Sequence, residues 1–136
     1  MKYLLDTSIC IYVIRNRPEH VAKRLKTVSV WHSVGLSSIT VAELEYGVHK
    51  STTPQKNAIA LMKFLLPFEV IPFGEEAAPF YGKIRADLEV RGEPIGANDM
   101  LIAATALAGS FTIVTNNESE FNRIPGLKNE NWVRGG

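Results

Sequence analysis

The sequence predicts an α/β fold of three layers, in which helices cover both faces of a short parallel sheet. Strand-like and helix-like segments alternate along the chain, which implies right-handed crossovers between parallel strands. The strand candidates are short and almost wholly apolar, as is typical of strands buried on both faces. The length of 136 residues, with 46% apolar and 21% charged residues, suits one globular domain with a sizeable core. We therefore expect residues 1–136 to form a single domain.

The first half of the chain contains two candidate strands and four candidate helices. Short apolar runs predict the strands, and each run ends at a polar residue. Proline marks helix boundaries, because Pro18 follows the end of the first helix and Pro54 lies in the first turn of the fourth. The expected strands are 2–5 and 34–37, and the expected helices are 8–16, 19–26, 40–50 and 54–66.

The second half contains three candidate strands and three candidate helices. Apolar residues at spacings of three and four predict an amphipathic helix over residues 75–90. Residues 98–108 are nearly all apolar, which predicts a helix buried on most sides. The expected strands are 69–72, 111–115 and a last edge strand within 127–133, and a further helix is expected at 117–123.

Several classes of protein are excluded by simple features. The single cysteine, Cys10, allows no disulfide within the chain, which fits the reducing cytoplasm, and its place in an apolar helix predicts an inert, packed thiol. Asp6 interrupts the apolar residues 3–14, so a signal peptide is not expected. Residues 100–117 are uncharged, but Gly109 and Ser110 divide them into two buried elements rather than a membrane span. No P-loop or dinucleotide-binding motif occurs.

The basic residues are unevenly distributed although the net charge is only +1. Residues 1–26 contain six basic residues against two acidic ones, a balance of +4. Such a patch can attract nucleic acid, and it can equally be a solvated helix face. The histidines His20, His32 and His49 have no metal-ligand spacing and are expected at the surface. Core packing is the expectation for the aromatic residues that follow helical spacing: Tyr46, Phe64, Phe68, Phe80 and Tyr81.

Four carboxylates occupy equivalent positions in successive strand–helix units. Asp6 follows the first strand, Glu43 and Glu120 lie in the first turns of helices that follow strands, and Asp99 begins the buried helix. Each residue alone is explained by helix capping, as in the capping box of Thr40 and Glu43. Together they are expected to converge, because the carboxyl ends of parallel strands meet at one edge of the sheet.

A cluster of carboxylates at that edge predicts a site for a hard divalent cation. Carboxylates in one crevice repel each other, and Mg²⁺ or Mn²⁺ relieves the repulsion with oxygen ligands. Such a site suits phosphoryl chemistry. Without the four site acids the chain has 15 basic and 10 acidic residues, so a polyanion is attracted to the remaining surface.

Four short segments resemble the motif blocks of PIN-domain proteins, and most closely those of VapC toxins from bacterial type II toxin–antitoxin modules. The blocks, in order and at compatible spacing, are LLDTS at 4–8, SSITVAEL at 37–44, PIGAND at 94–99 and VTNNESEF at 114–121. The resemblance implies a PIN-like α/β/α sandwich and a Mg²⁺-dependent endoribonuclease in which Mn²⁺ can substitute. It implies cleavage of tRNA, in some relatives in the anticodon loop of initiator tRNA. It also implies a homodimer, and a hetero-oligomer with a VapB-type antitoxin.

The resemblance assigns roles to residues of this chain. Asp6, Glu43, Asp99 and Glu120 fall on the acidic catalytic positions, with Asp6 and Asp99 as the principal metal ligands. Four polar residues are expected to orient these carboxylates: Thr7, Ser8, Thr115 and Asn117. Asn117 stands where many PIN domains have Asp, which leaves open whether one metal or two is bound. The antitoxin is expected to insert an arginine toward the carboxylates, with apolar residues in a groove between the first two helices and the helix at 40–50.

Two other readings follow from an acidic pocket. A receiver domain needs a lysine after a late strand, but residues 111–115 lead into Asn116 and Asn117. A D-x-D phosphatase fails because Asp6 is followed by Thr7 and Ser8. The alternative to an enzyme is a catalytically inactive PIN-like or receiver-like metal-binding interaction domain. Cleavage of RNA that is abolished by EDTA would distinguish the metal-dependent enzyme from the inactive interaction domain.

Overall fold

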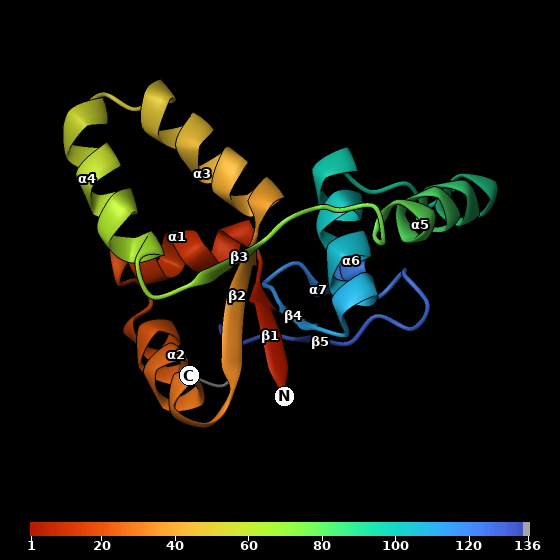
Figure 1. Ribbon diagram of the computed structural model, residues 1–136, viewed down its shortest axis with the longest axis horizontal. Coiled ribbons are helices and arrows are strands. Elements are labelled where there is room, and N and C mark those ends of the chain that lie inside the picture. Colours follow the sequence, from red (N-terminus) through yellow and green to blue (C-terminus); the bar gives the residue numbers. More distant parts are fainter. Residues whose placement is uncertain (135–136) are drawn as a thin grey trace.

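The computed structural model describes residues 1–134, in which a five-stranded parallel sheet is flanked by seven helices (Figure 1). The strands are β1 (Lys2–Leu5), β2 (Ser33–Ser37), β3 (Glu69–Ile71), β4 (Thr112–Val114) and β5 (Asn129–Glu130). The helices are α1 (Thr7–Arg15), α2 (Glu19–Trp31), α3 (Ser38–Lys50), α4 (Pro54–Leu65), α5 (Ala78–Val90), α6 (Ala97–Gly109) and α7 (Glu118–Phe121). The predicted α/β/α sandwich is therefore confirmed.

The sheet has the strand order β3-β2-β1-β4-β5, with β1 at its centre. All four pairings are parallel, and Leu4 lies opposite Gly35 on one side and Ile113 on the other. The strand order reverses at β1, because the chain passes first to β2 and β3 and later to β4 and β5. Receiver domains have the order 2-1-3-4-5, so the receiver-like alternative is wrong for this fold.

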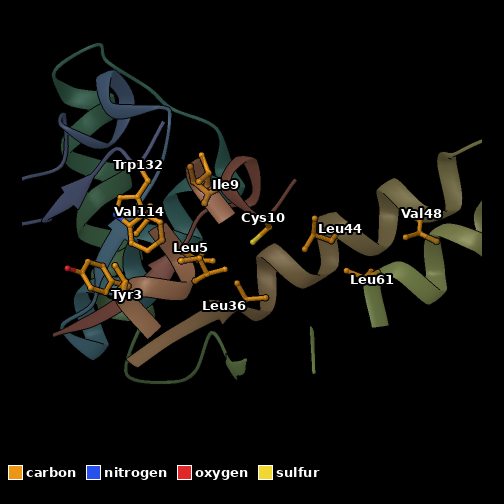
Figure 2. Close-up of a cluster of buried hydrophobic side chains, with 13 residues drawn as sticks. Tyr3, Leu5, Ile9, Cys10, Leu36, Leu44, Val48, Leu61, Val114 and Trp132 are labelled. Atoms are coloured by element: carbon orange, nitrogen blue, oxygen red, sulfur yellow. The ribbon is translucent and has the colours of Figure 1, made fainter. Parts of the chain in front are cut away.

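The alternating side chains of the central strands supply the cores of the two faces. Tyr3, Leu5 and Val114 face a cluster that α1, α2, α3 and α4 complete, shown in part in Figure 2. Leu4 and Ile113 face the opposite cluster, which α5, α6 and α7 complete. Tyr3, Leu4 and Leu5 of β1 and all three residues of β4 are buried, so these strands are short and largely apolar, as the sequence indicated.

Several element boundaries differ from the sequence prediction. Helix α2 continues past Lys26 to Trp31, because Val28 extends the buried stripe of Val21 and Leu25 by one turn. Helix α5 begins at Ala78 rather than at residue 75, after a turn closed by the hydrogen bond from the Ala77 amide to the Gly74 carbonyl. The expected last strand is reduced to the two residues of β5, which pair with β4 at the sheet edge.

Burial of single side chains follows the prediction in part. Cys10 is fully buried, which raises the pKa of its thiol, as an inert packed cysteine requires. His20 is half-buried and bonds the Val133 carbonyl at 2.7 Å rather than lying free on the surface. The expectation of core packing is wrong for Tyr46, which is 65% exposed, and for Phe80, which is 39% exposed. Among the described residues, no helix has the length and hydropathy needed to cross a bilayer.

Candidate active site

The four predicted carboxylates lie around the carboxyl end of the central strand, where the strand order reverses. Asp6 directly follows β1, Glu43 belongs to α3, Asp99 to α6 and Glu120 to α7. An open pocket at this edge is lined by Asp6, Thr7, Ser8, Glu43, Asp99, Asn116 and Asn117. Residues from α1, α3, α6 and the segment after β4 thus share one depression, at the place where open α/β sheets bind ligands.

Asp6 is the most deeply buried of the four carboxylates, with 5% of its surface exposed. Its Oδ1 accepts the Thr7 amide at 2.7 Å, and its Oδ2 accepts the Thr115 hydroxyl at 2.8 Å and the Ser8 hydroxyl at 3.3 Å. Burial raises the pKa of Asp6, and these three donors oppose the rise by stabilising the ionised form. The carboxylate is therefore fixed in orientation before anything binds.

Glu43 is held by side chains from two other helices. The Thr7 hydroxyl donates to Glu43 Oε1 at 2.7 Å, and the Asn98 amide donates to Oε2 at 3.4 Å. The predicted capping box of Thr40 and Glu43 is wrong, because α3 begins at Ser38 and Ser37 caps it by accepting the Ile39 amide at 3.0 Å. Glu43 consequently lies in the second turn of α3, where its side chain is free to bond across the pocket.

Glu120 is oriented from within its own segment. The Asn117 side chain donates to Glu120 Oε2 at 2.8 Å, and the Asn117 amide donates to Thr115 Oγ1, also at 2.8 Å. Thr115 in turn donates to Asp6, so one chain of hydrogen bonds joins Asp6 to the start of α7. Each of the four polar residues expected to orient a carboxylate contacts one of the carboxylates or the residue that holds it.

The carboxylates influence one another's ionisation. Burial and the negative charges of Asp6, Glu120 and Glu43 raise the pKa of Asp99 to about 7. Asp99 lies in the first turn of α6, but the N-cap of that helix is Gly96, so Asp99 is not the helix cap that the sequence alternatively suggested. A carboxyl group in this position costs free energy when ionised at neutral pH, unless a cation joins the site.

The residues of the pocket match the chemistry of a hard divalent cation. All the candidate ligands are oxygen atoms, and the pKa of Asp99 is raised by burial and by the repulsion of neighbouring carboxylates, which a cation relieves. Within residues 1–134 no three acidic, histidine or cysteine side chains are already gathered as a complete ligand set. An oxygen-only donor set of this kind fits a hard divalent cation.

Sequence reasoning missed two asparagines at the site, Asn116, which lines the pocket, and Asn98, which bonds a carboxylate of the pocket. The Asn98 side chain donates a hydrogen bond to Glu43. The Asn116 side chain donates to the Tyr12 hydroxyl at 3.1 Å and accepts a hydrogen bond from the Asn131 side chain at 3.2 Å. Both asparagines directly adjoin predicted site residues, Asp99 and Asn117. That adjacency was the only available signal, because the partners of both asparagines lie on other elements.

Comparison with known proteins places nearly the whole chain in one family. The PIN domain family matches residues 3–127. "Ribonuclease VapC2" of Rickettsia felis is 44% identical over 132 residues, which are 97% of this chain and 98% of the relative. "tRNA(fMet)-specific endonuclease VapC" of Salmonella typhimurium is 40% identical, with the same coverage of both chains.

Solved structures agree with the sequence matches. One match is a chain of VapBC2 from Rickettsia felis, whose structure was solved with a DNA fragment from the VapBC2 promoter. It has a TM-score of 0.93 and 43% sequence identity, and the match covers 97% of this chain and 99% of the other. A chain of VapBC-1 from nontypeable Haemophilus influenzae has a TM-score of 0.90 and 34% identity, covering 98% and 100%. The chain belongs to the PIN-domain family and, within it, to the VapC ribonucleases.

Proposed function

We propose that this protein is a toxin that hydrolyses RNA phosphodiester bonds, with Asp6, Glu43, Asp99 and Glu120 as its catalytic residues. The observation that carries the proposal is the convergence of Asp6, Glu43 and Asp99 on one pocket, where burial and the neighbouring carboxylates raise the pKa of Asp99 to about 7. Structural carboxylates are normally paired with cations, whereas Asp6, Glu43 and Asp99 line one pocket whose described lining residues include no cation, and the charge of Glu120 also acts on Asp99.

PIN-domain nucleases depend on a divalent metal, and we propose Mg²⁺ as the cation, with Mn²⁺ able to replace it. Asp6 and Asp99 would hold it, because their short side chains extend from element boundaries. A bound cation supplies positive charge that acidifies water and offsets the charge of the scissile phosphate. Glu43 and Glu120, held by Asn98 and Asn117, orient water and accept its proton.

The products of cleavage test this chemistry directly. Attack of water on phosphorus, with rupture of the bond to the 3′ oxygen, is expected to leave a 5′-phosphate and a 3′-hydroxyl. Attack by the ribose 2′-hydroxyl would leave a 2′,3′-cyclic phosphate and a 5′-hydroxyl. End-group analysis of RNA cut in Mg²⁺ distinguishes the two, with an EDTA-treated sample as the control. A cyclic product contradicts the role given to the carboxylates, and absence of cleavage favours the inactive interaction domain.

We propose tRNA as the substrate, and the anticodon loop of initiator tRNA as the first site to examine. The name of the Salmonella relative, which covers this chain almost completely, supports this choice. The excess of basic residues outside the pocket supports a polyanionic substrate. A cytoplasmic location is part of the proposal, and a tRNA substrate and the single, buried Cys10 support it.

A VapB-type antitoxin is the proposed inhibitor, in keeping with relatives solved as VapBC complexes. An apolar groove between α1, α3 and α4 is its proposed binding site, lined by residues that include Ile11, Ile14, Leu44 and Leu61. The sequence analysis expected a groove between α1, α2 and α3. In the structure the groove beside the acidic pocket is lined by α4 in place of α2. Glu43 lines both the groove and the acidic pocket. A peptide that fills the groove is therefore led toward the carboxylates.

The continuity of groove and pocket predicts how inhibition is lost. We expect an arginine of the antitoxin to pair with the carboxylates, because its guanidinium bonds two carboxylate oxygens at once and remains charged. Removal of the C-terminal segment of the antitoxin should abolish inhibition of RNA cleavage. Replacement of its inserted arginine by glutamine should weaken inhibition while the apolar contacts persist. If the truncated antitoxin still inhibits fully, this mode of neutralisation is wrong. We further propose a homodimer of the toxin within the toxin–antitoxin complex.

A further inference from the structure

One face of α3 continues from the acidic pocket along the helix. Ile39, Glu43, Tyr46 and Lys50 are spaced by four, three and four residues, so they share this face. Ile39, in the first turn, packs against the hydrophobic cluster built by α5 and α6. The same face in the outer turns therefore points toward the α5–α6 side of the site. Figure 1 shows these outer turns of α3 diverging from α6, so α6 leaves this face of them uncovered, while α4 packs along another face.

Tyr46 presents an aromatic ring on this uncovered face. The side chain is 65% exposed, and the Lys50 ammonium lies 5.7 Å from the ring centroid. Exposed aromatic rings backed by cations are the usual platforms on which proteins stack unpaired bases. Here the platform begins one turn beyond Glu43, which itself lines the acidic pocket. A base stacked on Tyr46 would therefore belong to a nucleotide next to the site of cleavage.

Charge favours the α3 side of the pocket for RNA. Residues 1–68 contain nine basic and four acidic residues, whereas residues 69–136 contain six basic and ten acidic ones. The arginines of the α5 region are already engaged: Arg85 pairs with Glu89 at 3.3 Å and Arg91 pairs with Asp87 at 3.0 Å. Within residues 1–134, no ion pair involves Lys50. A phosphate thus meets an available cation on α3, whereas both arginines of the α5 region are already paired.

We propose that Tyr46 stacks an unpaired base of the substrate and that Lys50 binds a phosphate of the same single-stranded segment. The proposal rests on the ribonuclease function and assigns to α3 the positioning of the RNA over the carboxylates. It explains why a large aromatic residue with helical spacing is left in solvent. It also fits a substrate with an unpaired loop, because bases within a duplex are not free to stack on a protein ring.

The test compares variants of Tyr46 in binding and in catalysis. Binding of a fluorescein-labelled anticodon stem-loop of initiator tRNA is measured in the Asp99→Asn background, where the RNA stays intact. Tyr46→Leu should weaken binding roughly tenfold, whereas Tyr46→Phe, which keeps the ring, should retain wild-type affinity. With Asp99 restored, Tyr46→Leu should raise KM more than it lowers kcat. Trp31→Leu is the matched control, because Trp31 is 82% exposed but precedes the amino end of β2, away from the site.

The logarithm of the affinity for the stem-loop falls linearly with the logarithm of the salt concentration. Lys50→Gln should make the magnitude of this slope smaller by about 0.7, which corresponds to the loss of one phosphate contact in a single strand. Lys128→Gln, at an exposed lysine that directly precedes the amino end of β5, should leave the slope unchanged. Equal binding by Tyr46→Leu and Tyr46→Phe would overturn the proposal. So would a change of sedimentation coefficient in Tyr46→Leu with unaltered RNA affinity, because Tyr46 would then be a contact between copies of the chain. A different result would show that the proposed nuclease function is wrong: wild-type protein would bind the stem-loop but would not cut it in Mg²⁺.

Discussion

Asp99→Asn is expected to lower RNA cleavage by about 10³-fold while the protein remains folded. The amide keeps the shape of the side chain but removes the charge that holds a divalent cation, and such a cation contributes several kcal/mol to phosphoryl transfer. The substitution also removes the repulsion among Asp99, Asp6 and Glu120, so the free energy of unfolding should not fall. Single-turnover cleavage of tRNA and thermal unfolding measure the two effects.

Asp6→Asn should abolish cleavage to the same extent but also destabilise the protein. Both Asp6 oxygens accept hydrogen bonds, and Thr115, which donates to Oδ2, itself accepts the Asn117 amide. An NH₂ group at either position faces a donor, which costs about 1–3 kcal/mol. Asp87→Asn is the matched control, since Asp87 is the remaining aspartate and lies on α5 in an exposed ion pair. Full cleavage by folded Asp99→Asn would remove Asp99 from the catalytic set.

The stability of the metal-free protein is expected to fall as the pH rises toward and through about 7. The pKa of Asp99 is raised from 3.8 to about 7 in the folded state, so between these values the native protein holds a proton that the unfolded chain has released. Stability gained from that proton is present at acidic pH and is lost as the pH rises through the folded pKa. Asp6, whose pKa is also raised, contributes in the same direction.

Thermal unfolding in EDTA, measured from pH 5 to pH 8, tests this linkage. The melting temperature of the wild type should decline across the range, and Asp99→Asn should decline less because it has no proton to lose. Added Mg²⁺ should stabilise the wild type most at the alkaline end, since the cation binds the ionised carboxylates and not the protonated ones. Identical pH profiles for wild type and Asp99→Asn would contradict the assigned electrostatic coupling.

The layers, the parallel sheet and the approximate positions of its elements could be predicted because they depend on local patterns. Buried parallel strands are apolar runs, and amphipathic helices repeat their apolar residues every three or four positions. The candidate carboxylates were identified from their places at strand ends and helix starts, and the resemblance of four motif blocks to PIN domains assigned them catalytic roles. Least predictable were the boundaries. The length of α2 depends on how far its neighbours extend over Val28, and β5 is limited by its pairing with β4.

Tertiary structure alone decided how the candidate residues act on one another. The bond from Thr7 to Glu43 and the raised pKa of Asp99 both arise between elements distant in sequence. The presence of α4 rather than α2 in the groove likewise depends on how distant elements pack.

Tyr46 shows most clearly what helical periodicity does not determine, because its helical spacing is the same as that of a core residue. Periodicity assigns a side chain to a face of its own helix, but burial of that face depends on whether another element reaches it. On α3 the covering helix α6 diverges after the first turns, so Ile39 is packed and Tyr46 remains in solvent.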